Sequence, residues 1–63
     1  MSALTFYRTE LGVLLNRISW KLSDFERENI YSKMDEIAFK IVKLFPNWYN
    51  EGKIKKVKYE DWV

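Results

Sequence analysis

Apolar residues recur at steps of three and four positions through the first third of the chain. They are Leu4, Tyr7, Leu11, Leu14, Leu15, Ile18 and Leu22. Because successive residues of an α-helix are rotated by about 100°, these steps place the whole set on one side of a helix. Gly12 disfavours the helix by about 1 kcal/mol relative to alanine but does not interrupt the pattern. We therefore predict a helix over about residues 3–22.

A second helix is predicted directly after the first. Ser23 and Glu26 have the spacing of a capping box, in which each side chain bonds to the backbone amide of the other residue. The apolar side of this helix then comprises Ile30, Met34, Ile37, Ala38, Ile41, Leu44 and Phe45. Pro46 disfavours helical geometry at the residue before it. The second helix is therefore predicted over about residues 24–45.

The connection between the two helices is short, which forces them to run antiparallel as a helical hairpin. Their apolar sides are also in step along the helix axes. The residues predicted at equal heights are Leu11 with Met34, Leu14 with Tyr31, Tyr7 with Ala38, and Leu4 with Ile41. The predicted fold class is all-α, and residues 1–63 form a single small domain.

Five further apolar residues lie outside the two main apolar sides, and we call them the second apolar set. They are Phe6, Val13, Trp20, Phe25 and Phe39. On the first helix they recur every seven residues, roughly 150° from the centre of the main apolar side. A helix that is apolar on both sides is usually covered on both sides. The cover is predicted to be the chain's own tail, a second copy in a four-helix dimer, or a foreign protein that these residues contact.

The tail, residues 46–63, is predicted to pack on the hairpin. Pro46 can open a short helical turn through Asn50, and Gly52 can end it. The rest of the tail shows neither strict alternation nor helical spacing. We predict an extended or short β segment there, with a bulge near Lys55–Lys56.

Lysines and aromatic rings alternate irregularly in this tail. The residues are Trp48, Lys53, Lys55, Lys56, Lys58, Tyr59 and Trp62. Rings that stack on bases, with ammonium groups along the phosphates, are typical of single-stranded nucleic-acid binding. However, Glu51, Glu60 and Asp61 offset most of the lysine charge, and the whole chain carries only +2. The lysines are better explained as a solvated edge whose alkyl stems cover neighbouring rings, and contacts to an acidic protein are a further alternative.

Size and composition narrow the chemistry. A chain of 63 residues buries only about 60% of its unfolded surface, so its core needs further support. The chain has no cysteine and no histidine, which excludes disulfides, the usual zinc ligands and the familiar nucleophile systems. A glycine-rich phosphate loop is also absent, since Gly12 and Gly52 are the only glycines. We expect no enzymatic activity, no cofactor, no metal and no small-molecule substrate.

The first apolar stretch is interrupted by Arg8, Glu10, Asn16 and Arg17. These interruptions argue against a secretory signal peptide and against a membrane-spanning helix. Insertion of Phe6 and Trp20 into a membrane surface is disfavoured, because the main apolar side of the first helix fits a partner helix. We expect a cytoplasmic protein without a membrane partner.

No protein family is recognised in these residues. In outline, the hairpin of residues 3–45 resembles small plasmid- and phage-encoded regulators, including Rop-like helical-hairpin dimers. That resemblance is one of architecture, and it implies an accessory regulatory protein. Our main hypothesis is a small protein-interaction module, a regulator or inhibitor that binds a larger protein or forms a homodimer. The alternative is a nucleic-acid-binding protein that uses the basic and aromatic tail.

Overall fold

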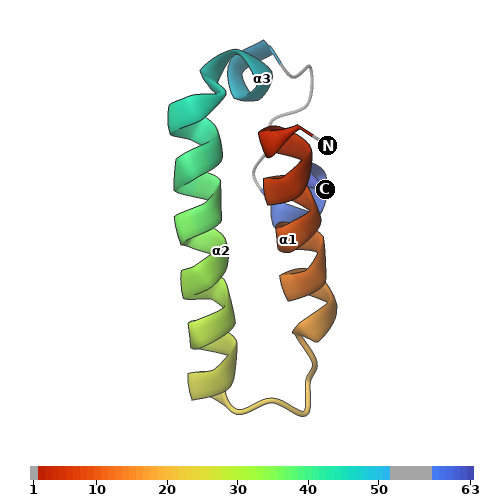
Figure 1. The fold of residues 1–63 in the computed structure, drawn as a ribbon. Helices are drawn as coiled ribbons and strands as arrows, with labels where there is room; N and C mark the ends of the chain where they lie inside the picture. Colours follow the sequence, from red (N-terminus) through yellow and green to blue (C-terminus); the bar gives the residue numbers. More distant parts are fainter. Residues whose placement is uncertain (1, 52–57) are drawn as a thin grey trace.

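The computed structural model describes residues 2–51 and 58–63. These residues form three α-helices and one 3-10 helix, in the order α1 (Ala3–Arg17), α2 (Asp24–Leu44), α3 (Pro46–Glu51) and η1 (Tyr59–Trp62). The described residues contain no β-strand. The all-α class is therefore confirmed. The long helices α1 and α2 lie side by side and run in opposite directions (Figure 1).

The first helix is shorter than predicted and ends at Arg17 instead of residue 22. Ile18 is already extended, with φ −72° and ψ 125°. The next turn is held by Ser19, whose hydroxyl accepts from the Lys21 amide at 3.2 Å and whose carbonyl accepts from the Leu22 amide at 3.1 Å. A serine that bonds to neighbouring backbone in this way competes with helix formation. Trp20 consequently lies in the connection, outside the helical periodicity used to place it.

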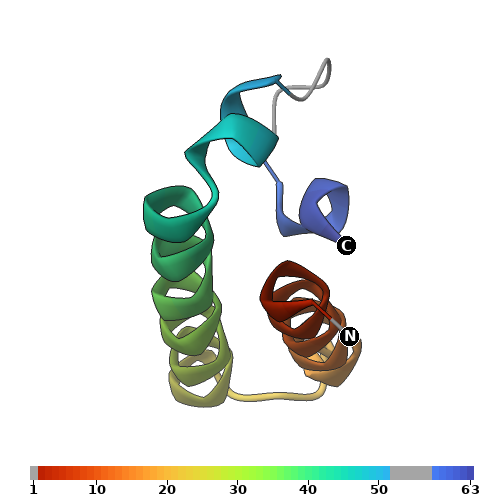
Figure 2. The ribbon, with the colours of Figure 1, turned by 45° about the horizontal axis from the view of Figure 1, so that its top comes forward.

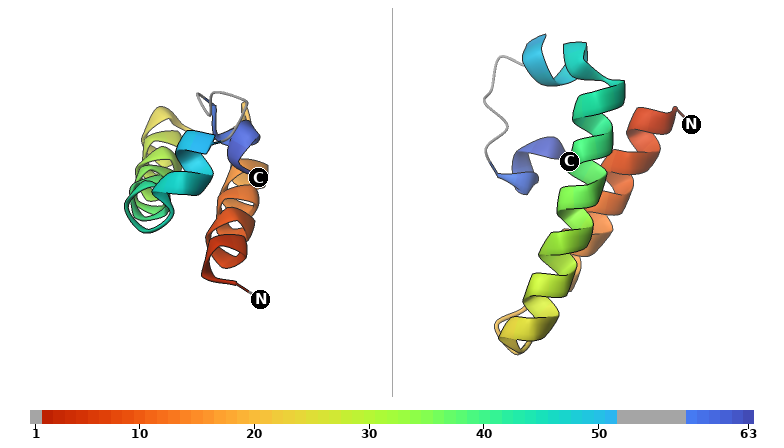
Figure 3. Two further views of the ribbon diagram at one scale, coloured as in Figure 1. Left: turned by 90° about the horizontal axis from the view of Figure 1, so that it is seen from above. Right: turned by 90° about the vertical axis from the view of Figure 1, so that its left-hand side faces the viewer.

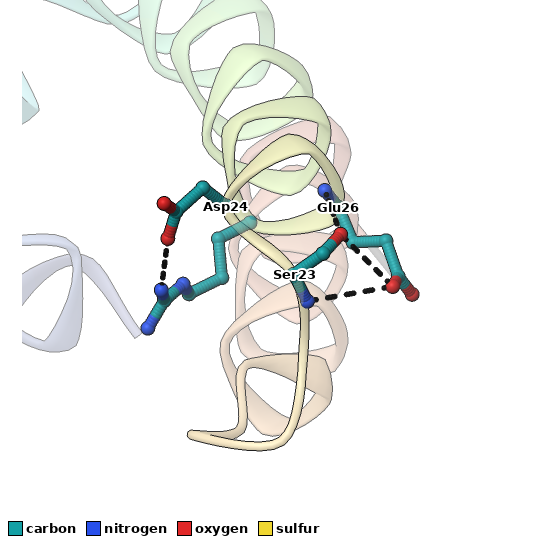
Figure 4. A network of polar contacts seen from close by, with 4 residues as sticks. Ser23, Asp24 and Glu26 are labelled. Atoms are coloured by element: carbon teal, nitrogen blue, oxygen red, sulfur yellow. Dashed lines mark hydrogen bonds and ion pairs between the residues drawn. The ribbon is translucent and has the colours of Figure 1, made fainter.

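The second helix begins where the capping box predicts. The Glu26 amide donates to the Ser23 hydroxyl at 3.1 Å, and the Ser23 amide donates to the Glu26 carboxylate at 3.4 Å (Figure 4). In the same turn, Arg27 and Asp24 form an ion pair. The helix ends at Leu44, one residue earlier than predicted, and Phe45 serves as its C-cap. Pro46 then opens α3, as expected for a residue that lacks an amide hydrogen.

The core lies between α1 and α2. Its buried residues are Leu11, Leu14, Met34, Ile37, Ala38, Ile41 and Trp62. Apart from Trp62, every member belongs to one of the two predicted apolar sides. Two residues predicted to face the core lie at its margin instead: Tyr31 is 46% exposed and Leu44 is 56% exposed.

The start of the tail matches the predicted helical turn, since α3 spans Pro46–Glu51, but its end differs from the predicted extended or β segment. Residues 59–62 form a 3-10 helix, in which the Asp61 amide donates to the Lys58 carbonyl at 2.9 Å. A 3-10 helix has three residues per turn, so Tyr59 and Trp62 share one side, and both pack on the core. An extended segment could not turn both rings inward at that spacing. The β-bulge predicted near Lys55–Lys56 lies outside the described residues.

Both tail elements lie on the same side of the helix pair (Figures 2 and 3). Trp62 is surrounded there by three rings, with centroid distances of 5.3 Å to Tyr49, 5.9 Å to Tyr59 and 6.1 Å to Trp48. We call these four residues the tail cluster. It packs against the interhelical core, so the tail supplies a third layer on one face of the helix pair.

Arg8 fastens the tail cluster to α1. Its Nε donates to the Trp62 carbonyl at 2.8 Å, and its guanidinium lies 5.2 Å from the centre of the Trp48 ring. One turn further along α1, a Cβ added at Gly12 would lie 3.2 Å from Cγ1 of Val63. A residue without a side chain therefore lets the end of the tail approach the helix closely.

Candidate protein-interaction surface

The second apolar set is exposed. The exposed fractions are 83% for Trp20, 72% for Phe25, 68% for Phe39, 54% for Val13 and 50% for Phe6. The described part of the tail does not cover these residues, because its rings pack against the interhelical core instead. The first predicted cover is therefore wrong for the described tail residues. Within the described residues, one tryptophan and three phenylalanines are thus at least half exposed.

These five residues do not form one continuous face. The buried sides of α1 and α2 face each other, so residues about half a turn away point outward in opposite directions. Phe6 lies on the outer side of α1 and Phe39 on the outer side of α2, whereas Val13 borders a groove between the two helices.

Trp20 and Phe25 do share one region. Trp20 lies in the connection between α1 and α2, and Phe25 lies in the first turn of α2, at the end of the helix pair that the connection closes (Figure 1). The ammonium group of Lys21 is 5.6 Å from the centre of the Trp20 ring. We call Trp20, Lys21 and Phe25 the aromatic end.

A second feature is a shallow groove between α1 and α2. Its volume is about 460 Å³, and it is lined by Glu10, Val13, Leu14, Lys33, Glu36, Ile37 and Lys40. Gly12 and Asp35 contact the tail, and Glu10 and Lys33 lie two residues earlier, about 200° around each helix. The groove therefore lies on the face of the helix pair opposite the tail. We call it the groove face.

The groove has an apolar floor and a charged rim. Leu14 and Ile37 are each 8% exposed, and Val13 beside them is 54% exposed. Two acids and two lysines surround this floor. Among the described residues, the ion pair found is the one between Asp24 and Arg27. The spacing of Lys33, Glu36 and Lys40 places them along one side of a helix, but nothing in the sequence sets these charged residues apart from an ordinary solvated surface.

On the tail side, a further hollow of about 610 Å³ lies beneath η1. Its lining consists of Leu15, Ile18, Tyr31, Lys58, Tyr59 and Glu60. The Tyr59 hydroxyl donates to the Asp35 carboxylate. Burial, and then the bond to Asp35 and its negative charge, raise the pKa of Tyr59 to about 12. Tyr59 is therefore a protonated donor that joins η1 to α2 at neutral pH.

The residues predicted for nucleic-acid binding differ in how exposed their side chains are. Trp62 is 5% exposed, so its ring is not available to stack on a base. Trp48 and Tyr59 are half-buried in the tail cluster, and Lys58 is exposed. Lys53, Lys55 and Lys56 lie outside the described residues. Arg8 was not predicted as a tail contact, because nothing local to it signals the distant Trp62 carbonyl.

The described residues offer neither a metal-binding cluster nor a membrane-spanning helix. Within residues 2–51 and 58–63, no group of three or more acidic, histidine or cysteine side chains could hold a metal ion. In the same part of the chain, every helix is too short or too polar to cross a membrane.

Comparisons with known protein families, with curated protein sequences and with solved structures found no match to this chain. Any functional conclusion therefore depends on the residues and their arrangement.

Proposed function

We propose that the chain is a small protein-interaction module without enzymatic activity. It acts as a regulator or inhibitor, by binding a larger protein or as a dimer of itself. The observation that carries this proposal is the aromatic end, where Trp20 is 83% exposed and Phe25 is 72% exposed. Aromatic side chains bury about 150–250 Å² each and are enriched among the residues that dominate binding energy.

The aromatic end has the properties of a contact site. It stands at a helix terminus that the capping box of Ser23 and Glu26 defines. Trp20 and Phe25 each have few rotatable bonds, and little conformational entropy is lost when they are buried. Lys21 adds a cation beside the Trp20 ring, which can pair with an acidic group on the rim of a target site. Steric occlusion of that target requires no chemistry from the module.

The nucleic-acid alternative draws no support from the described residues. A single-stranded nucleic acid needs exposed rings for stacking. Trp62 and Trp48 are instead engaged in the tail cluster, and Arg8 lies over Trp48. Of the four lysines named for this function, only Lys58 lies within the described residues.

The test is capture of a target with matched variants. The chain is immobilised through its amino terminus, which lies toward the opposite end of the helix pair from the aromatic end (Figure 1). We expect wild type to capture a defined protein from the source cells. The double variant Trp20→Ser, Phe25→Ser should lose it, with unchanged circular dichroism because both side chains are exposed.

Val42→Ser serves as the matched control, since Val42 is 39% exposed on α2 and lies away from the aromatic end. It should retain capture. Phe39→Ser then tests whether the outer side of α2 also contributes. Equal capture by wild type and by the double variant would refute the role of the aromatic end, and a loss of helical signal would show that its rings stabilise the fold.

A further inference from the structure

We infer that the groove face binds the groove face of a second copy of this chain, forming a two-fold symmetric dimer. The inference rests on the proposed function, because it names one partner of the interaction module. It uses a different surface from the aromatic end. The two surfaces can therefore be tested separately.

The chain exposes more surface than is expected for its mass. A folded monomer of this mass is expected to expose about 4300 Å². This chain, at 7.7 kDa, exposes 5027 Å². The excess is about 700 Å², close to the roughly 800 Å² that each partner buries in a stable protein interface. One additional covered face would bring the chain to the surface area of an ordinary folded protein.

One face of the helix pair remains to be covered. The tail cluster covers one face of the helix pair and is fastened there by Arg8. The opposite face carries the groove, whose floor is apolar and whose neighbour Val13 is half exposed. Helical domains are stable when apolar surface is buried between packed layers. Two groove faces in contact would place the helix pairs of both copies in the middle and a tail on each outer side.

The charges on the groove rim are complementary to those on the same rim of a second copy. On the groove rim, α1 contributes Glu10, whereas α2 contributes Lys33 and Lys40 together with Glu36. None of these four forms an ion pair within the described part of the chain. Opposite charges on the two sides of one groove match an identical groove, provided that each helix meets the other helix of the second copy. The rim therefore fits the chain's own surface.

Charge also selects the symmetry axis. An axis parallel to the helices lays α1 over α2 of the second copy and brings Glu10 opposite Lys33, since both line the groove at similar height. An axis perpendicular to the helices lays α1 over α1 and brings Glu10 toward its own counterpart, which is repulsive. The geometry points to the parallel axis, with two Glu10–Lys33 pairs per dimer.

The experiment measures the solution mass of the whole chain by light scattering and sedimentation over a concentration series. Wild type should be dimeric. Glu10→Lys and Lys33→Glu should each raise the dissociation constant roughly tenfold or more, because every cross pair becomes repulsive. An equal mixture of these two variants, one carrying a small tag, should form a mixed dimer in which both pairs are restored.

Two further variants sharpen the test. Val13→Asp places a charge beside the apolar groove floor and should abolish the dimer, while its half-exposed position leaves the monomer folded. Glu28→Lys makes the same charge change as Glu10→Lys outside the groove and should leave the dimer unchanged. Circular dichroism checks that each variant remains helical.

Three results would overturn the inference. The first is a wild type that stays monomeric up to about 1 mM, which is a weak affinity for any specific dimer. The second is a dimer that the groove variants do not weaken. The third is a mixture of the two charge variants that fails to associate. The first result would leave the proposed function intact, because capture through the aromatic end is measured independently. Conversely, a groove dimer with no effect of the aromatic-end variants would refute only the role of Trp20 and Phe25.

Discussion

The two faces of the helix pair are finished in different ways. On one face, Trp62 from the far end of the chain is 5% exposed, and Arg8 holds its carbonyl at 2.8 Å. On the other face, the same two helices present a shallow groove with four charged residues around an apolar floor. The difference teaches that this short chain covers one side of its core with its own tail and leaves the other side open. Substitutions on the tail face should therefore change folding, and substitutions on the groove face should change association.

The largest expected effect separates two tryptophans. Trp62→Ala removes the centre of the tail cluster and should lower the free energy of unfolding by about 3–5 kcal/mol, as for other buried tryptophans. Trp20→Ala removes the same side chain at 83% exposure and should change it by less than about 0.5 kcal/mol. Urea titration followed by circular dichroism measures both. Equal losses would mean that the tail face contributes no more to stability than the exposed connection.

The next effect compares two cations on opposite faces. Arg8→Met removes the bond to the Trp62 carbonyl and the contact with the Trp48 ring, and should cost about 1–3 kcal/mol of unfolding free energy. Lys40→Met, on the groove rim, should cost less than about 0.5 kcal/mol at a dilution where the chain is monomeric. A stable Arg8→Met variant would show that the rings hold the tail without this cation.

A third prediction uses pH to address the contact between Tyr59 and Asp35. Because the pKa of Tyr59 is raised to about 12, its bond is fully present below pH 10. Stability from this group is then lost as the pH rises through about 12, where the folded protein must deprotonate Tyr59. Tyr59→Phe should remove this component of the wild-type pH dependence, whereas Tyr31→Phe should retain it. Urea titrations between pH 9 and 12 compare the three proteins.

The smallest effect concerns the close approach of Gly12 and Val63. Gly12→Ala should raise the free energy of unfolding by only about 0.5 kcal/mol, since the gain in helix propensity is partly offset by crowding against Val63. In a Val63→Ala background the same change should gain about 1 kcal/mol. A double-mutant cycle measures the coupling between the two positions. Additive effects would contradict the contact.

Local signals in the sequence predicted most of the helical structure. Ser23 and Glu26 marked the start of α2 because a capping box involves only neighbouring residues. Periodicity identified the core residues of both helices because it reports rotation around one axis. The end of α1 was predicted too late, because periodicity reports rotation around the axis and not where the helical hydrogen bonds stop. Ile18 and Leu22 continue the apolar pattern, whereas the bonds made by Ser19 terminate the helix.

The tail and the candidate surfaces depend on distant contacts. The 3-10 helix at Tyr59–Trp62 is favoured by burial of Trp62 against α1 and α2, and neither helix is close to it in sequence. The members of the second apolar set could be recognised from the sequence. The directions in which they point follow only from the packing of α1 against α2. The groove rim was overlooked because charged residues on a helix are ordinary until an apolar floor is seen between them.

The unequal lengths of the two long helices have a consequence for motion. α2 has 21 residues and α1 has 15, so the first turn of α2 continues past the point where α1 has ended. Amides there should exchange with solvent through local fraying, while those around Leu11, Met34 and Ile41 should exchange only when the core opens. Protection of backbone amides from exchange should therefore be lowest near Trp20 and Phe25. Their rings can adjust to a partner's shape on a fast timescale while the rest of the helix pair stays closed.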